Sequence, residues 1–274
     1  MEKVIKYLLE VFLKMKMTED QTKFPMPVIL TCPHGGIARL SPKRVDSNLP
    51  PGCSRDNFSD DSDLLTIHLT ESIAANVYNL SEKKVYKKIA LVHRRFVDFN
   101  RNAECAFENS NDNRAKYLYD EYHDGILETI KKMHERNKNG SRFLFDIHGT
   151  QESDADMYFG TDAKNPEGST ICGLLRLNPK ALWDDTGLIK LLQDKGYKTC
   201  PKEMGDDELS KLDGGTTVRN YGGCNFNQRV EAIQCEIASK FREEDNLPKL
   251  EKLAKDMAEC ISTFVSRYIS ETNS

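Results

Sequence analysis

The sequence lacks the long apolar runs that membrane spans require. No stretch approaches the roughly 20 consecutive apolar residues of a transmembrane helix, so we predict no contact with a membrane. A long basic run is also absent, and the 274 residues carry a net charge of −4, so a nucleic-acid partner is not indicated. Hydrophobic residues make up 38% of the chain, which predicts an ordinary globular protein with a sizeable core.

The sequence also lacks CxxC pairs and a secretory signal. Glu10 interrupts the apolar core that a signal peptide would need near the N-terminus. Eight cysteines are scattered along the chain: Cys32, Cys53, Cys105, Cys172, Cys200, Cys224, Cys235 and Cys260. We therefore predict free thiols and a cytoplasmic location, although an even number of cysteines also permits disulfides.

Residues 1–17 at the start of the sequence have an amphipathic pattern. Its apolar residues recur at helical spacing, with charged residues between them. We predict that residues 1–22 form a helix and a polar connector, with the helix packed on the domain rather than inserted in a membrane. Residues 23–274 contain no repeat and no low-complexity tract, so we predict one further domain.

Apolar, β-compatible runs alternate with helical patterns along this domain. Strands are predicted at 27–32, 89–92, 142–148 and 230–237. Helices are predicted at 62–79, 113–137, 186–195 and 247–270, and loops at 38–61, 150–170 and 213–227. The alternation predicts an α/β fold in which a mixed, mostly parallel sheet has helices on both faces, giving three layers.

Polar side chains follow two of the predicted strands. His34 comes after the first strand and precedes two glycines, and His148 ends the central strand. Chemistry in α/β proteins lies beyond the carboxyl ends of the strands, where these histidines are expected to meet. Imidazole is a good zinc ligand, and catalytic zinc usually has three protein ligands. We therefore predict that both histidines bind a metal, although backbone-bonded loop histidines are the alternative.

The third ligand is expected to be a carboxylate near the start of the helix at 62–79. Asp63 is the preferred candidate, because Asp60 and Asp61 also suit helix capping. Asp146 points the same way as His148 along a strand, so it can either touch the metal or orient that histidine. Asp60, Asp61 and Asp146 therefore remain alternatives to Asp63 as the third ligand.

Glu236 is a carboxylate within the apolar strand at 230–237. Burying a lone carboxylate costs several kcal/mol unless it is paired or neutralised. We predict that Glu236 is a general base that takes a proton from water, with a buried salt bridge to Arg229 as the alternative.

Arginines gather after the strand at 89–92. Arginine binds carboxylates through a bidentate fork, so Asn100 and Arg101 suit a substrate carboxylate. A structural pair between an arginine and Asp98 is the alternative, and both can hold at once. Arg94, Arg95 and Arg219 are further candidates for substrate binding.

Five motifs in a fixed order span about residues 28–240. They are Pro33-His34-Gly35-Gly36, the spacing Asp63…Thr66…Leu69, Arg94-Arg95-Phe96-Val97-Asp98-Phe99-Asn100-Arg101, Asp146-Ile147-His148-Gly149 and Gln234-Cys235-Glu236-Ile237. Together they resemble the motifs of N-formylglutamate amidohydrolase-like proteins, which are related to zinc carboxypeptidases.

The resemblance implies a phosphorylase/hydrolase-like α/β/α fold and a single metallohydrolase domain at 23–274. It implies one catalytic Zn²⁺ per chain, or another divalent transition metal, held by His34, Asp63 and His148. It further implies hydrolysis of the amide of an N-acyl amino acid similar to N-formylglutamate, a small acidic substrate, with Glu236 as base. Arg101 would anchor the α-carboxylate beside Asn100.

Two other functions stay compatible with the sequence. A metallopeptidase would release amino acids from short peptides but not from acyl amino acids. A catalytically silent binding protein for an acidic metabolite would be stabilised by its ligand without turnover. The sequence leaves the oligomeric state, the acyl group and the amino acid open.

Overall fold

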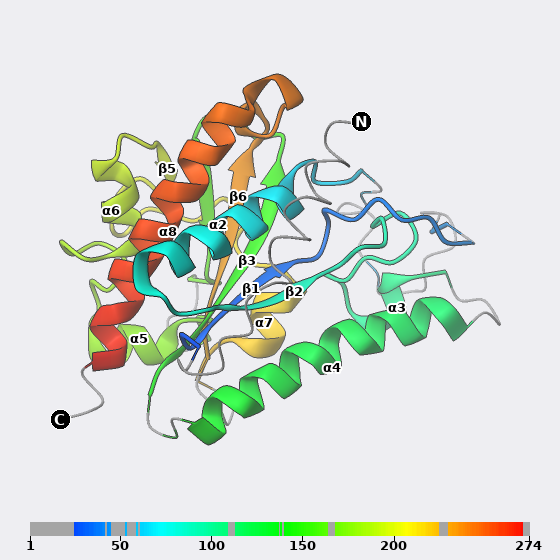
Figure 1. Cartoon of the computed structure of the whole chain (residues 1–274), viewed down its shortest axis with the longest axis horizontal. Helices are drawn as coiled ribbons and strands as arrows, with labels where there is room; N and C mark the ends of the chain where they lie inside the picture. The colour runs from blue at the N-terminus through cyan, green and yellow to red at the C-terminus, as the bar shows by residue number, and fades with distance from the viewer. Residues whose placement is uncertain are drawn as a thin grey trace.

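The computed structural model describes residues 25–41, 43, 44, 53, 59, 61–108, 113–136, 138, 140–163, 168–224 and 230–270. In them, six strands form one sheet in the order β2-β1-β3-β6-β4-β5 (Figure 1). The strands are β1 (Val28–Cys32), β2 (Tyr86–Ile89), β3 (Arg142–Thr150), β4 (Met157–Gly160), β5 (Thr199–Cys200) and β6 (Val230–Ala238). Neighbouring strands are parallel except β4 and β6, which confirms the predicted mixed, mostly parallel sheet.

The central strands are buried on both faces. Every residue of β1 and β6 is buried, as is all of β3 except Gly149. Strands that helices cover on both sides are rich in apolar residues, and the short apolar runs Val28-Ile29-Leu30 and Phe143-Leu144-Phe145 made β1 and β3 visible in the sequence. Alternate side chains enter separate cores: Phe145 and Ile147 pack on one face, and Leu144 packs on the other.

Helices cover the two faces, as the three-layer prediction requires. In Figure 1, α2 (Thr66–Ser81) and α8 (Leu247–Ser270) lie on one side of the sheet, and α4 (Asn113–Arg136) and α7 (Thr216–Tyr221) on the other. The shorter helical elements are α3 (Ala103–Ala106), α5 (Cys172–Leu177), α6 (Leu188–Asp194), η2 (Ser239–Phe241) and η3 (Glu244–Asn246). None of the described helices has the length and apolar character that a membrane crossing demands.

The sequence prediction fails where elements are short or half exposed. The strand predicted at 89–92 is observed earlier, as β2, because this edge strand is only half buried and carries two lysines. The predicted loops at 150–170 and 213–227 contain β4 and α7, which are too short for a periodic signal. The predicted N-terminal helix lies outside the described residues.

Four of the eight cysteines are paired, so the prediction of free thiols is wrong for them. Disulfides join Cys53 to Cys105 and Cys172 to Cys224. Partners 52 residues apart are brought together only by the fold, which the spacing alone could not show. Because structural disulfides persist mainly in oxidising compartments, these pairs weigh against the cytoplasmic location, which stays a prediction.

Packing of α8 on α2 is expected to be a main source of stability. Leu253 of α8 is fully buried in the core that also contains Leu69 and Ile73 of α2. Leu253→Ala is expected to lower the free energy of unfolding by about 3 kcal/mol through the cavity that it leaves. Urea denaturation should show a lower midpoint with an unchanged slope. Lys249→Ala, on the exposed side of α8, is the control, and equal midpoints for the two variants would contradict the prediction.

Candidate active site

Polar residues of β3 and β6 line one face of the sheet near the carboxyl ends of the strands. In the register of these two strands, His148 lies opposite Glu236, and Asp146 lies opposite Gln234. Because side chains alternate along a strand, all four share the face that α4 and α7 cover, while Ile147 enters the core on the α8 side. Strand periodicity alone therefore places His148 on one surface with two carboxylates, Asp146 and Glu236.

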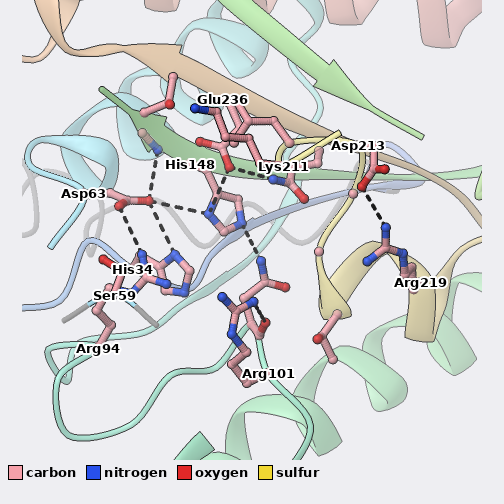
Figure 2. Close-up of a pocket in the computed structure, with 18 of the residues that line it drawn as sticks. His34, Ser59, Asp63, Arg94, Arg101, His148, Lys211, Asp213, Arg219 and Glu236 are labelled. Carbon is pink, nitrogen blue, oxygen red and sulfur yellow. Dashed lines mark hydrogen bonds and ion pairs between the residues drawn. The ribbon is translucent and has the colours of Figure 1, made fainter. Parts of the chain in front are cut away.

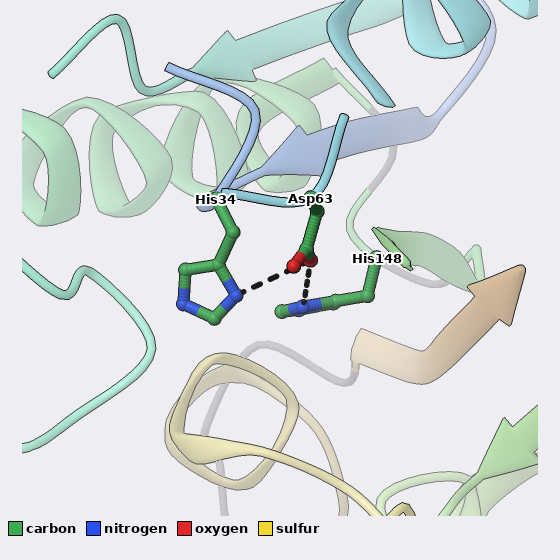
Figure 3. A group of neighbouring side chains, drawn as sticks. All are labelled: His34, Asp63 and His148. Carbon is green, nitrogen blue, oxygen red and sulfur yellow. Dashed lines mark ion pairs between the residues drawn. The ribbon is translucent and has the colours of Figure 1, made fainter. Parts of the chain in front are cut away.

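His34, Asp63 and His148 form a buried cluster (Figure 3). His34 follows β1, and Asp63 precedes α2. The Nδ1 atom of each histidine lies 3.5 Å from Oδ2 of Asp63, and one potential ligand atom from each residue lies within 4.8 Å of the others. The structure thus brings together the three residues that we predicted as metal ligands.

A buried carboxylate holds the other ring nitrogen of each histidine. Nε2 of His34 lies 2.7 Å from Asp98, and Nε2 of His148 lies 2.8 Å from Asp146. Such a contact fixes the ring and leaves Nδ1 for a metal. Nδ1 of His34 is buried and has no hydrogen-bond partner among the described residues. An orphaned nitrogen that faces a second imidazole and a carboxylate suits zinc, which prefers nitrogen and oxygen ligands of this kind.

The ionisable groups of the cluster stabilise the charged forms of one another. Burial alone would raise the pKa of Asp63, but its contacts with His148 and His34 hold this pKa well below its usual value. Burial would lower the pKa of His148, yet Asp146 and Glu236 raise it well above its usual value. Without a metal, a proton on His148 therefore compensates the carboxylates, and a metal ion would replace that proton.

Asp98 links His34 to the arginine-rich stretch. This fully buried carboxylate accepts hydrogen bonds from Arg94 at 2.9 Å, Arg44 at 3.2 Å and the backbone N–H of Asn100 at 3.1 Å. Burial would raise the pKa of Asp98, but Arg94 and His34 hold it well below its usual value. The structural pair between an arginine and Asp98 is thus observed, and it is made by Arg94 and Arg44.

The other candidates for the third ligand differ in position. Asp61 is exposed, and Asp60 lies outside the described residues. Asp146 accepts a hydrogen bond from Thr31 through Oδ1 at 2.6 Å and faces the neighbouring histidine through Oδ2. The helix-capping role considered for Asp61 is not observed, since the N-cap of α2 is Leu65 and no side chain caps it. Asp63 is therefore the best placed carboxylate.

Glu236 is buried and stands beside the cluster. Its Oε1 atom lies 3.9 Å from Nδ1 of His148 and accepts a 2.6 Å hydrogen bond from Nε2 of Gln234. Burial raises the pKa of Glu236 above its usual value. A carboxylate with a raised pKa at the edge of a cavity is suited to taking up and returning a proton.

A cavity of about 460 Å³ opens onto the cluster (Figure 2). Of the predicted substrate-binding residues, Arg94, Asn100, Arg101 and Arg219 line it, whereas Arg95 is not among the described residues that do. The volume is in the range of small-molecule sites. Most of the cationic side chains that we selected from the sequence therefore converge on one cavity with the histidines.

Asn100 connects the cluster to α7. Its Oδ1 atom accepts a 2.8 Å hydrogen bond from the backbone N–H of Thr217, and its Nδ2 atom lies 3.4 Å from Nε2 of His148. A Cβ atom at Gly215 would lie 2.1 Å from this Nδ2 atom, so any other residue there would force the Asn100 side chain out of its observed position. Asn100 thus has partners within the protein, and its predicted contact with a substrate carboxylate stays a prediction.

Sequence reasoning missed several residues of the cavity. Gln234 was part of a motif but received no role, although its position two residues before Glu236 placed it on the same face of a strand. Asp213, at the start of the predicted loop at 213–227, also lines the cavity, as does Lys211, for which no element was predicted. Arg44 contacts Asp98 from a long loop, where no local pattern signals a tertiary contact.

Asp146, whose carboxylate contacts Nε2 of His148, gives a testable prediction. Asp146→Asn is expected to weaken zinc binding by about 10- to 100-fold, because the amide holds the ring nitrogen less firmly and stabilises less charge on the imidazole. The zinc dissociation constant can be measured by competition with a chelator. Asp154→Asn, on an exposed turn, is the control. An unchanged constant in Asp146→Asn would show that this carboxylate does not support the site.

Comparisons with known proteins identify the fold but no family. No family model matches the chain, and no curated protein matches it. The structure of N-formylglutamate amidohydrolase from Ralstonia eutropha JMP134 is similar, with a TM-score of 0.60, 14% identity, and coverage of 90% of this chain and 96% of that one. A gene product of Agrobacterium tumefaciens matches with a TM-score of 0.50, 12% identity, and coverage of 90% and 92%. At these identities the similarity concerns the fold.

Proposed function

We propose that this protein is a zinc-dependent hydrolase that cleaves the amide bond of N-acyl amino acids. One observation carries the proposal: two carboxylate-backed histidines and Asp63 surround a common point beside the buried Glu236. The fold shared with a protein described as an N-formylglutamate amidohydrolase supports the reaction class. One zinc ion per chain, or another divalent transition metal, is part of the proposal.

The ligand set would be His34, Asp63 and His148. A bound ion of this kind supplies Lewis acidity, which polarises the scissile carbonyl and lowers the pKa of the attacking water. The protein's contribution is to hold both rings in place through Asp98 and Asp146, so that their Nδ1 atoms face Asp63.

Glu236 would move the proton. It takes a proton from the attacking water as the oxygen–carbon bond forms, and returns it to the amine nitrogen as the amide bond breaks. The products are a carboxylic acid and a free amino acid. Gln234 donates to Oε1 of Glu236 and so fixes the orientation of this carboxylate.

Arg101 would hold the α-carboxylate of the substrate. It lines the cavity next to Asn100, and its Nη1 atom lies 3.3 Å from the carbonyl oxygen of that residue. A guanidinium matches a carboxylate through two parallel hydrogen bonds. We propose a small acidic molecule as the partner of this cavity, and neither a nucleic acid nor a membrane.

A substrate screen on zinc-loaded protein tests the proposal. N-formyl and N-acetyl amino acids, the matching dipeptides and a non-hydrolysable N-sulfonyl amino acid are compared, with release of free amino acid as the readout. Turnover of acyl amino acids supports the proposal. Turnover of dipeptides alone would replace it with a peptidase. Thermal stabilisation by these compounds without any turnover would indicate a binding protein.

A further inference from the structure

We propose that the cavity selects N-acyl amino acids with a neutral or basic side chain and disfavours acidic ones, because carboxylates already pair with the cations of its outer wall. The outer wall is residues 210–216 together with Arg219. This inference rests on the proposed function and narrows its substrate class. It concerns the side chain alone, since the α-carboxylate is assigned to Arg101.

The outer wall faces the metal cluster across the cavity. Figure 2 shows Asp213 and Arg219 on the side away from His34 and Asp63, with Arg101 between the two groups. A substrate whose carbonyl lies at the cluster and whose α-carboxylate meets Arg101 has its remaining large substituent directed toward this wall. With a small acyl group, that substituent is the amino-acid side chain.

Arg219 is held by two carboxylates. Its Nη2 atom lies 2.9 Å from Oδ1 of Asp213, and its Nε atom lies 3.4 Å from Oδ2 of Asp162. The Asp213 side chain is only 14% exposed, and it lines the cavity together with Arg219. The guanidinium of Arg219 therefore faces the cavity with its positive charge already compensated by Asp213 and Asp162.

Lys211, the other cation of the wall, is paired as well. Its Nζ atom lies 2.6 Å from Oε1 of Glu152. Both cations of the wall therefore already have carboxylate partners, and one of these, Asp213, lines the cavity itself. A substrate carboxylate that approaches Arg219 also approaches Asp213, and like charges at such distances oppose binding. A neutral amide or an ammonium group meets no such repulsion.

The test compares side chains on one scaffold. N-formyl derivatives of glutamate, glutamine and lysine are assayed, since glutamate and glutamine differ in charge but hardly in shape. We expect kcat/KM for the glutamine and lysine derivatives to exceed that for the glutamate derivative at least tenfold. The N-acetyl series repeats the comparison with a different acyl group. A glutamate derivative that equals or exceeds the other two would overturn the inference.

A charge-neutralising variant tests whether Asp213 causes the discrimination against acidic side chains. Asp213→Asn is expected to raise kcat/KM for the glutamate derivative about tenfold and to lower it for the lysine derivative. Asp194→Asn, which removes a surface carboxylate paired with Lys190, should leave the ranking unchanged. If the substrates rank in the same order by kcat/KM in Asp213→Asn as in the wild type, the role assigned to Asp213 is contradicted. If Asp213→Asn does not fold, the wild-type comparison still decides the question.

The two proposals fail in different ways. If no acyl amino acid is hydrolysed with any side chain, the proposed function is wrong. If acyl amino acids are hydrolysed but glutamate is preferred, the function stands and only the assignment of the outer wall fails.

Discussion

His148→Ala is expected to reduce bound zinc from about one ion per chain to background, with a loss of turnover of about 10³-fold or more. The substitution removes one of the two proposed nitrogen ligands and leaves Asp146 and Glu236 without the charge that compensates them. Two ligands do not hold zinc as three do, so the loss should not be rescued by moderate zinc excess. Metal content by mass spectrometry, on variant and wild type purified identically, measures the effect.

His134→Ala is the matched control for that experiment. His134 lies near the end of α4 and contacts Arg142, away from the cavity. It should retain zinc at the wild-type level. Full zinc content in His148→Ala, or no zinc in the wild type even after reconstitution, would break the proposed mechanism at its first step.

Glu236→Gln is expected to lower kcat about 10²- to 10⁴-fold while zinc content stays at the wild-type level. The amide preserves the size of the side chain but cannot accept the proton of the attacking water. Because the substrate is held by other groups, KM should change little. Steady-state kinetics on the best acyl amino acid, together with metal analysis of the same sample, separate loss of the base from loss of the metal.

Glu121→Gln controls for the loss of one carboxylate. Glu121 is an exposed residue of α4 that pairs with Lys88, and its replacement should leave kcat within error of the wild type. Wild-type kcat in Glu236→Gln would remove this residue from the mechanism. A loss of zinc in Glu236→Gln would instead assign it to the metal site.

The parts of the site that the sequence predicted come from regular geometry. His148 and Asp146 share a face because a strand has a period of two, and they meet His34 because parallel strands end at one edge of the sheet. The approach of Asp63 to both histidines depends on how the segment before α2 folds, which strand periodicity does not determine. The buried central strands were visible through short apolar runs such as Phe143-Leu144-Phe145, although each strand also carries polar residues.

The parts that the sequence could not give depend on contacts between distant segments. Asp98 reaches His34 across 64 residues, and Asn100 reaches Thr217 across 117. No local pattern encodes such pairs. The disulfide between Cys172 and Cys224 is of the same kind, as the eight cysteines allow many pairings. Short elements such as α7 are defined by these contacts rather than by their own periodicity.

The contact between Asn100 and Gly215 has a consequence for how substrates enter. The amide group of Asn100 lies against both His148 and the first turn of α7. Asn100 therefore joins the segment around Gly215, which belongs to the outer wall, to the histidine cluster. We expect a site joined in this way to be largely preformed before a substrate binds. Positions 100 and 215 should also vary together in other sequences of this fold: wherever the asparagine is kept, the glycine must be kept too.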